Sequence, residues 1–596
     1  MRFCLGLLLA AAAWAQPRAI VREFTHSSQV MGATQAYRVF LPPAYDASPK
    51  RYPVIYWLHG YETSAEQDEY NRQVADYVSL HDVIVVNAGP VETVGESPLY
   101  FPELVDRVDK TLRTVADRDH RAVTGYSAGG FSAFWTAGKY PDLVSGASSF
   151  MGPTEYTAGP KGFPAELNLD DLWANYDGVR TRLVTGSRDF LQFYDRRLNA
   201  IWSYACANHE TEAFDSAHGA PAIAKTLDFH LAGFAHPLPR PLVFSHADVY
   251  PNFVIWGWDV ATNRRRPGIT VLENVSRTGF RSAVREWIPG GAAIPEVKLS
   301  VASAPRLYLP GSVQPVTFLR LRDGRIRRAM LKADAEGRLN FDLDGDAWEV
   351  GVGARPVLTI TGLEMVDASW ATAGLPVKLR VKFFNKGGPG PAGRSQALPL
   401  HWESPNPGVK IDAATNHLSG LAPGETVTMP VTFAVADPAR AIVKMVAVVG
   451  SAHLPISIPL YPAAQPAKDF QIADGRSLTV YQHAVEKGPL PLGEGNGDGY
   501  AAPGESFAIL LPDGDAYRAA EVFTSDACVD NSTRASDSWV DYDRSGASGK
   551  YSVPRILPTC APGTVIHLLA RVVIPNAPNH QLRYYALEFP VWWRNQ

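Results

Sequence analysis

The pentapeptide Gly125-Tyr-Ser-Ala-Gly129 is the feature that most restricts how this chain can fold. It follows a short predicted strand at 121–124 and precedes a segment with helical spacing at 129–140. A serine between two glycines at such a strand-to-helix turn is typical of a nucleophile elbow, whose strained turn exposes the hydroxyl above the carboxyl edge of a sheet. We therefore predict that Ser127 is a nucleophile, and that Gly125 and Gly129 let the strand and the helix approach closely.

Strands and helices alternate around this elbow. Val54–His59 and Val83–Asn87 are predicted strands, and the second is apolar almost throughout, as expected of a parallel strand buried on both faces. Helical spacing recurs at 102–116 and 220–231. This alternation implies a doubly wound, mostly parallel sheet, and together with the elbow it predicts an α/β-hydrolase fold over residues 16–236.

The sequence changes character after His236. At 596 residues the chain is too long for one domain. A proline-rich linker at 237–241 is followed by short alternating segments separated by Gly, Pro, Asn and Asp, which is the pattern of all-β sandwiches. We predict a multidomain chain in which the α/β-hydrolase domain is followed by a β-rich module at 237–355, a β-sandwich at 356–460 and a C-terminal β-sandwich at 461–596.

The first fifteen residues have the pattern of a signal peptide. Arg2 precedes an apolar run, 3–13, that is too short to span a bilayer, and residues 13–15 fit the small-x-small rule for cleavage before Gln16. No later run of about 18 apolar residues predicts a membrane span. We therefore predict that residues 1–15 are a signal peptide and that the mature protein is secreted or periplasmic.

Cysteine use and charge bear on partners and cofactors. An oxidising compartment makes Cys528 and Cys560 a candidate disulfide pair. The chain carries 56 Lys and Arg against 60 Asp and Glu, without a basic block, so it lacks the electrostatic footprint of a nucleic-acid-binding protein. The acidic strings at 342–346 and 496–499 supply too few oxygen ligands for calcium. We interpret them as polar turns and predict neither a metal nor a cofactor.

The acid and the base that would activate the serine are predicted from chain order, which in this fold runs Ser, acid, His. Asp189 follows a predicted strand at 181–185, where the acid loop belongs, and His218 follows a predicted strand at 212–217. We predict that Asp189 orients the imidazole of His218, which acts as the general base. The alternative acids and bases are Asp170, Asp171, Asp195, His209, His230 and His236.

Two backbone N–H groups are predicted to stabilise the oxyanion of a tetrahedral intermediate. One belongs to Ala128, the residue after the nucleophile. The other belongs to Tyr61, because Gly60 lets the loop after the strand turn tightly. We interpret His59, in the same loop, as structural.

Four segments of the α/β region carry a family resemblance: Tyr52–Gly60, Asp106–Arg121, Gly125–Gly130 and Gly186–Leu191. Together they resemble a family of esterases that includes feruloyl esterases, acetyl xylan esterases, S-formylglutathione hydrolase and the mycolyltransferases. The resemblance covers about residues 35–235 and implies a carboxylesterase on an α/β-hydrolase fold, with Ser127, Asp189 and His218 as its triad.

The sequence departs from the family pattern in two places. Ala128 stands where the family commonly has Met or Gln, which implies a wider acyl pocket. His218 lacks the glycines that usually precede the family's histidine and the Trp that usually follows it.

The predicted activity is hydrolysis of carboxylic esters through an acyl-enzyme, with feruloyl or acetyl esters on polysaccharide as candidate substrates. Two alternatives stay open: acyl transfer of the mycolyltransferase type, and a secreted adhesion or binding protein with an inactive hydrolase domain. Residues 356–459 resemble adhesion-related modules of secreted bacterial proteins, so we expect the β modules to contact a carbohydrate or a cell surface, or to act as spacers. We interpret Trp592 and Trp593 as buried strand aromatics rather than a sugar platform.

Overall fold

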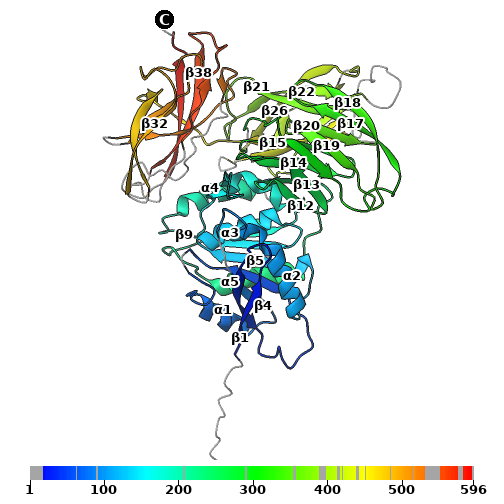
Figure 1. The fold of residues 1–596 in the computed structure, drawn as a ribbon. Coiled ribbons are helices and arrows are strands. Elements are labelled where there is room, and N and C mark those ends of the chain that lie inside the picture. The colour runs from blue at the N-terminus through cyan, green and yellow to red at the C-terminus, as the bar shows by residue number, and fades with distance from the viewer. Residues whose placement is uncertain are drawn as a thin grey trace, which may run out of the picture.

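The computed structural model describes residues 18–593 with internal gaps, and Figure 1 shows an N-terminal α/β part below two groups of β-strands. The predicted signal peptide lies outside the described residues. Within them, no helix is long and apolar enough to cross a membrane. The gaps are residues 62, 89–91, 206–207, 289–290, 354–357, 388–397, 413–416, 419, 438–441, 450–451, 483–484, 514–515, 531–550 and 575–580.

The α/β part (residues 18–236) is built on an eight-stranded sheet with the order β1-β2-β4-β3-β5-β6-β9-β10. The pairs β1–β2 and β2–β4 are antiparallel, whereas the pairs from β4 to β10 are parallel. The strands are β1 (Ile20–Ser27), β2 (Thr34–Leu41), β3 (Val54–Leu58), β4 (Ile84–Ala88), β5 (Arg121–Tyr126), β6 (Gly146–Phe150), β9 (Arg180–Gly186) and β10 (His209–Phe214).

Helices cover both faces of this sheet, because alternate residues of its central strands point to opposite sides. Val54, Tyr56 and Leu58 of β3 pack with α2, α3 and α4, whereas Ile55 and Trp57 pack with α1 and α5. The helices are α1 (Asn71–Val78), α2 (Phe101–Thr111), α3 (Ala128–Lys139), α4 (Gln192–Ala205) and α5 (Ile223–Ala235), with 3₁₀ turns η1 (Ser97–Leu99), η2 (Arg118–His120) and η3 (Leu169–Tyr176).

The second part (residues 237–353) consists of two sheets that share one hydrophobic core. Its six-stranded sheet has the order β11-β14-β15-β20-β17-β18, and its four-stranded sheet has the order β12-β13-β16-β19. The strands are β11 (Phe244–Asp248), β12 (Asn252–Ile255), β13 (Trp258–Thr262), β14 (Ile269–Ser276), β15 (Gly279–Arg285), β16 (Lys298–Ala302), β17 (Val313–Arg320), β18 (Ile326–Lys332), β19 (Asn340–Asp344) and β20 (Trp348–Val352).

The third part (residues 358–460) also has two sheets around one core, each with four strands. Strand β22 shows why these segments form sheets: its inward residues are apolar and its outward residues are charged, in strict alternation from Val377 to Lys382. The strands are β21 (Leu358–Met365), β22 (Val377–Asn385), β23 (Leu398–Glu403), β24 (Val409–Asp412), β25 (His417–Leu418), β26 (Thr426–Val435), β27 (Ile442–Val449) and β28 (Ala452–Pro459).

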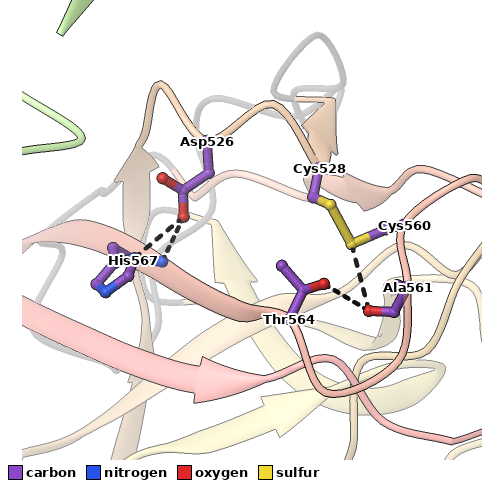
Figure 2. Close-up of a disulfide and its surroundings, with 6 residues drawn as sticks. All are labelled: Asp526, Cys528, Cys560, Ala561, Thr564 and His567. Carbon is purple, nitrogen blue, oxygen red and sulfur yellow. Dashed lines mark hydrogen bonds and ion pairs between the residues drawn. A yellow bond between two sulfur atoms is a disulfide. The ribbon is translucent and has the colours of Figure 1, made fainter. Parts of the chain in front are cut away.

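The C-terminal part (residues 461–593) contains several smaller sheets, the largest with the order β29-β39-β38-β35. A disulfide joins Cys528 to Cys560, whose Cα atoms lie 5.3 Å apart (Figure 2). The strands are β29 (Gln465–Pro466), β30 (Gln471–Ala473), β31 (Arg476–Gln482), β32 (Val485–Leu492), β33 (Ala508–Asp513), β34 (Ala516–Ala519), β35 (Glu521–Phe523), β36 (Val529–Asp530), β37 (Arg555–Ile556), β38 (Val565–Ile574) and β39 (Gln581–Pro590).

The structure confirms the predicted division into an α/β part and a strand-rich remainder, while the domain boundaries stay predictions. One interpretation is wrong: Trp592 and Trp593 lie beyond the end of β39 rather than within a strand, and Trp593 is 65% exposed. Its neighbour Trp592 is half-buried and stacks on Tyr500, with ring centroids 4.2 Å apart.

Candidate active site

The turn between β5 and α3 forces Ser127 into a conformation that few non-glycine residues adopt. Its φ is 56° and its ψ is −123°, and its N–H donates to the Phe150 carbonyl of β6 at 2.9 Å. A Cβ on Gly125 would lie 2.2 Å from the Gly129 carbonyl oxygen, and a Cβ on Gly129 would lie 2.1 Å from the Leu58 carbonyl oxygen. Both glycines are therefore required by close backbone contacts, and the strain at Ser127 is held by the surrounding strands.

His218 links Ser127 to Asp189. Its Nε2 lies 3.0 Å from the Ser127 Oγ, and its Nδ1 lies 2.8 Å from the Asp189 Oδ1. Asp189 follows β9 and is fully buried, and its Oδ1 also accepts the N–H of Leu191 at 3.2 Å. With the Nδ1 proton donated to the carboxylate, Nε2 is left to accept the proton of the serine hydroxyl.

The alternative acids and bases take other positions in the α/β part. The Asp170 carboxylate pairs with Arg197, and Asp195 is buried within α4. His209 contacts the Thr181 hydroxyl at 2.9 Å, and His230 contacts the Ser148 hydroxyl at 2.8 Å. Asp171 lies in η3 and His236 caps the C-terminus of α5. It is Ser127, Asp189 and His218 that the structure brings together in one hydrogen-bonded chain.

Two aromatic side chains pack near the His218 ring. The ring centroid of Tyr126 lies 5.1 Å from that of His218, and the Phe190 centroid lies 4.6 Å from it. The hydroxyl of Tyr70 accepts the Ala220 N–H at 3.0 Å, which ties down the loop after the histidine. Our sequence reasoning missed these contacts, although Tyr126 lies inside the elbow motif and Phe190 directly follows Asp189.

A second buried carboxyl lies close to Asp189. Burial raises the pKa of Asp195 well above its ordinary value, a hydrogen bond from Thr185 lowers it, and the charge of Asp189 raises it further. Asp195 therefore keeps its proton more readily than an exposed aspartate, and only Asp189 of the two contacts the imidazole.

The predicted oxyanion donors lie at the edge of a pocket of about 750 Å³. Ala128 is the first residue of α3, so its N–H is one of those without a partner inside the helix. Gly60, which precedes the other predicted donor Tyr61, also lines the pocket, and a Cβ on Gly60 would lie 3.2 Å from the Tyr126 ring. The pocket is lined by Glu23, Gln35, Ala36, Tyr37, His59, Gly60, Tyr61, Thr63, Ser64, Ala65, Glu66, Glu92, Thr93, Val94, Ala128 and Tyr156.

Comparison with known proteins gives matches within the α/β part. Residues 99–227 match the family model described as "Putative esterase". Two curated relatives from Mycobacterium tuberculosis, Esterase MT1326 of strain CDC 1551 / Oshkosh and Esterase Rv1288 of strain H37Rv, are each 31% identical over 178 residues. The match covers 28% of this chain and 38% of each relative, so the chain spans well under two thirds of their length.

Solved structures with lower identity resemble the same region. A ferulic acid esterase is 20% identical with a TM-score of 0.33, and the match covers 36% of this chain and 99% of that chain. The S-formylglutathione hydrolase FrmB from Staphylococcus aureus is 17% identical with a TM-score of 0.31, over 36% and 99% of the two chains. The family match and the curated relatives confirm that this chain resembles esterases, and the residues that match the family model, 99–227, lie within the α/β part.

Proposed function

We propose that this protein is a secreted serine carboxylesterase that hydrolyses carboxylic esters through an acyl-enzyme at Ser127. The observation that carries the proposal is the hydrogen-bonded chain from the Ser127 Oγ through His218 to Asp189, with contacts of 3.0 and 2.8 Å. A serine, a base and a buried acid in this order form the arrangement that acyl transfer requires.

The first half of the proposed reaction acylates the enzyme. The Ser127 Oγ attacks the ester carbonyl while the His218 Nε2 takes the hydroxyl proton, and Asp189 stabilises the imidazolium that forms. The N–H groups of Tyr61 and Ala128 donate to the carbonyl oxygen as it becomes negative. When the C–O bond breaks, His218 gives its proton to the leaving alcohol.

The second half reverses these roles with water. His218 removes a proton from a water molecule, which attacks the acyl carbonyl, and Ser127 leaves with that proton as the acid is released. The groups that act are side chains and backbone N–H groups of this chain.

The pocket beside Ala128 supports an ester of substantial size. Its volume of about 750 Å³ falls in the range of small-molecule sites. Tyr37, Tyr61 and Tyr156 line it, and Tyr61 is 72% exposed, so flat aromatic surface is available to an acyl group. We therefore include feruloyl esters, together with acetyl esters, among the candidate substrates on polysaccharide.

Burst kinetics test the proposal. With p-nitrophenyl acetate, the full chain is expected to release one equivalent of p-nitrophenol per active site in a fast phase, and Ser127→Ala is expected to lose both the burst and turnover. Ser132→Ala, one turn along the same helix, is the matched control and is expected to retain both. Full activity in Ser127→Ala would refute the proposal.

The same assay separates the alternatives. Added alcohol acceptors that take most of the acyl group in place of water would identify an acyltransferase. Absence of a fluorophosphonate adduct at Ser127 in the folded protein would favour a binding protein with an inactive hydrolase domain.

A further inference from the structure

The turn between β11 and β12 reaches back from the second part of the chain to the candidate active site. We propose that Tyr250 and Val249 in this turn are positioning residues that fix the wall of the substrate pocket. The inference rests on the proposed function of Ser127 and adds to it that the wall depends on residues outside the α/β part.

Tyr250 makes a direct hydrogen bond to the pocket loop. Its hydroxyl donates to the Gly95 carbonyl oxygen at 2.7 Å, and its side chain is buried. The ring of Tyr250 also lies parallel to that of Trp135 on α3, with centroids 6.3 Å apart. Burial raises the pKa of Tyr250, so its hydroxyl keeps the proton that it donates.

The loop that Tyr250 contacts is part of the pocket. Thr93 and Val94 line it, and the backbone of this loop is tied to Gly159, which follows β7 (Glu155–Ala158). Gly95 donates to the Gly159 carbonyl at 2.8 Å, and Gly159 donates to the Thr93 carbonyl at 3.0 Å. The Thr93 hydroxyl donates to the Thr157 carbonyl at 2.7 Å. A displacement of Gly95 would therefore also move Thr93 and Val94, which line the pocket.

Val249 packs against Gly159, whose backbone is hydrogen-bonded to Thr93 and Gly95. A Cβ on Gly159 would lie 3.2 Å from the Cγ2 of Val249, and Gly159 has a φ of +109°. The glycine therefore allows the turn and the pocket wall to pack without a side chain between them. The Val249 carbonyl in turn accepts a hydrogen bond from the buried guanidinium of Arg264.

The turn is anchored to the helix that starts at the nucleophile. Lys139, the last residue of α3, forms an ion pair with Asp248, and both side chains are 2% exposed. The Asn175 amide donates to the Ala247 carbonyl at 3.0 Å and accepts the Ala247 N–H at 2.9 Å. Because Lys139 ties the turn to α3 and Asn175 ties it to η3, the position of Tyr250 is fixed relative to the α/β part that carries Ser127.

The test compares two buried tyrosines of the second part in the full chain. Tyr250→Phe removes the hydroxyl that contacts the pocket loop, whereas Tyr308→Phe removes a hydroxyl that donates to the Arg277 carbonyl at 2.6 Å. We expect Tyr250→Phe to raise KM about fivefold to tenfold for esters with bulky acyl groups, with kcat changed less, because the unpaired Gly95 carbonyl lets the loop shift. We expect Tyr308→Phe to leave KM unchanged.

A second readout separates this inference from the proposed function. Labelling of Ser127 by a small fluorophosphonate is expected to proceed at the wild-type rate in both tyrosine variants. Equal KM values in Tyr250→Phe, Tyr308→Phe and wild type, with labelling intact, would overturn the positioning role alone. Absence of labelling in wild type would overturn the proposed function instead.

Val249→Ala provides an independent variant in case Tyr250→Phe does not fold. It leaves the Tyr250 hydroxyl in place and opens space against Gly159. The same KM increase for bulky esters is expected, and an unchanged KM in this folded variant would also count against the inference. Thermal unfolding of each variant shows which of them are folded.

Discussion

Replacing Asp189 by Asn tests the role of the buried charge next to His218. Asp189 is 0% exposed and its Oδ1 lies 2.8 Å from the imidazole Nδ1, so the centres of the two charges are about 4 Å apart. At that separation the attraction between carboxylate and imidazolium is about 4 kcal/mol for an effective dielectric constant near 20. Since each 1.36 kcal/mol is about a factor of ten in rate, Asp189→Asn is expected to lower kcat about a thousandfold.

The measurement is kcat for p-nitrophenyl acetate at saturating substrate, with folding checked by thermal unfolding. Asp195→Asn is the matched control, because it changes a buried carboxyl close to the same loop that makes no contact with His218. We expect the control to lose less than about tenfold in kcat. A kcat for Asp189→Asn within tenfold of wild type would refute the reasoning, because the imidazolium would then not depend on that charge.

Three other predictions concern stability. Gly129→Ala is expected to prevent folding or to lower the melting temperature sharply, as measured by circular dichroism, because its Cβ would lie 2.1 Å from a backbone oxygen of β3. Burial raises the folded-state pKa of Asp195, so stability is lost as the pH rises above the ordinary value of 3.8 towards the folded value. Asp195→Asn should therefore raise the free energy of unfolding at pH 7 but not at pH 3. The expected gain, measured in urea titrations, is about 1.4 kcal/mol for each unit by which the folded-state pKa exceeds the unfolded-state pKa. Replacing Cys528 and Cys560 by Ser removes a crosslink with a sequence separation of 32 residues, which should destabilise the C-terminal part by about 3–4 kcal/mol in differential scanning calorimetry.

The sequence predicted the elbow because the motif itself contains the residues that its close contacts require, although some of those contacts are with a distant strand. The contacts that require Gly125 and Gly129 involve the strand and helix that the motif itself joins, together with the neighbouring β3. The positions of Asp189 and His218 followed from chain order along parallel strands, whose carboxyl ends meet at one edge of the sheet. The bounds of β9 and β10 differ from the predicted ones by only a few residues.

Helix ends were predicted less well, because tertiary pairing decides them. Helical spacing continues to residue 116, but α2 ends at Thr111, and Leu112 is already extended. Thr114 instead forms an isolated bridge with Tyr52, just before β3. Hydrophobic periodicity reports only the local preference for a helix. It cannot show that Thr114 pairs instead with a residue 62 positions earlier in the chain.

The contribution of the second part to the pocket was also missed. The proline-rich linker at 237–241 marks where the chain leaves the α/β part. It does not predict which later residues pack back against the α/β part. Val249 and Tyr250 belong to the same hydrophobic core as the central sheet, although Tyr250 contacts a residue 155 positions earlier. Such long-range packing depends on the complete fold rather than on composition.

Strand β10, one of the two edge strands of the eight-stranded sheet, has a consequence for how the protein behaves at high concentration. An exposed edge strand offers unpaired backbone groups to a strand of another molecule, which is a route to aggregation. On β10, the outermost strand at that edge, Glu210 and Glu212 both pair with Arg182, and Glu212 also pairs with Lys225. Charged side chains on an edge strand are one of the features that discourage edge-to-edge pairing, so this row of ion pairs is expected to make β10 a poor template for a strand of another molecule.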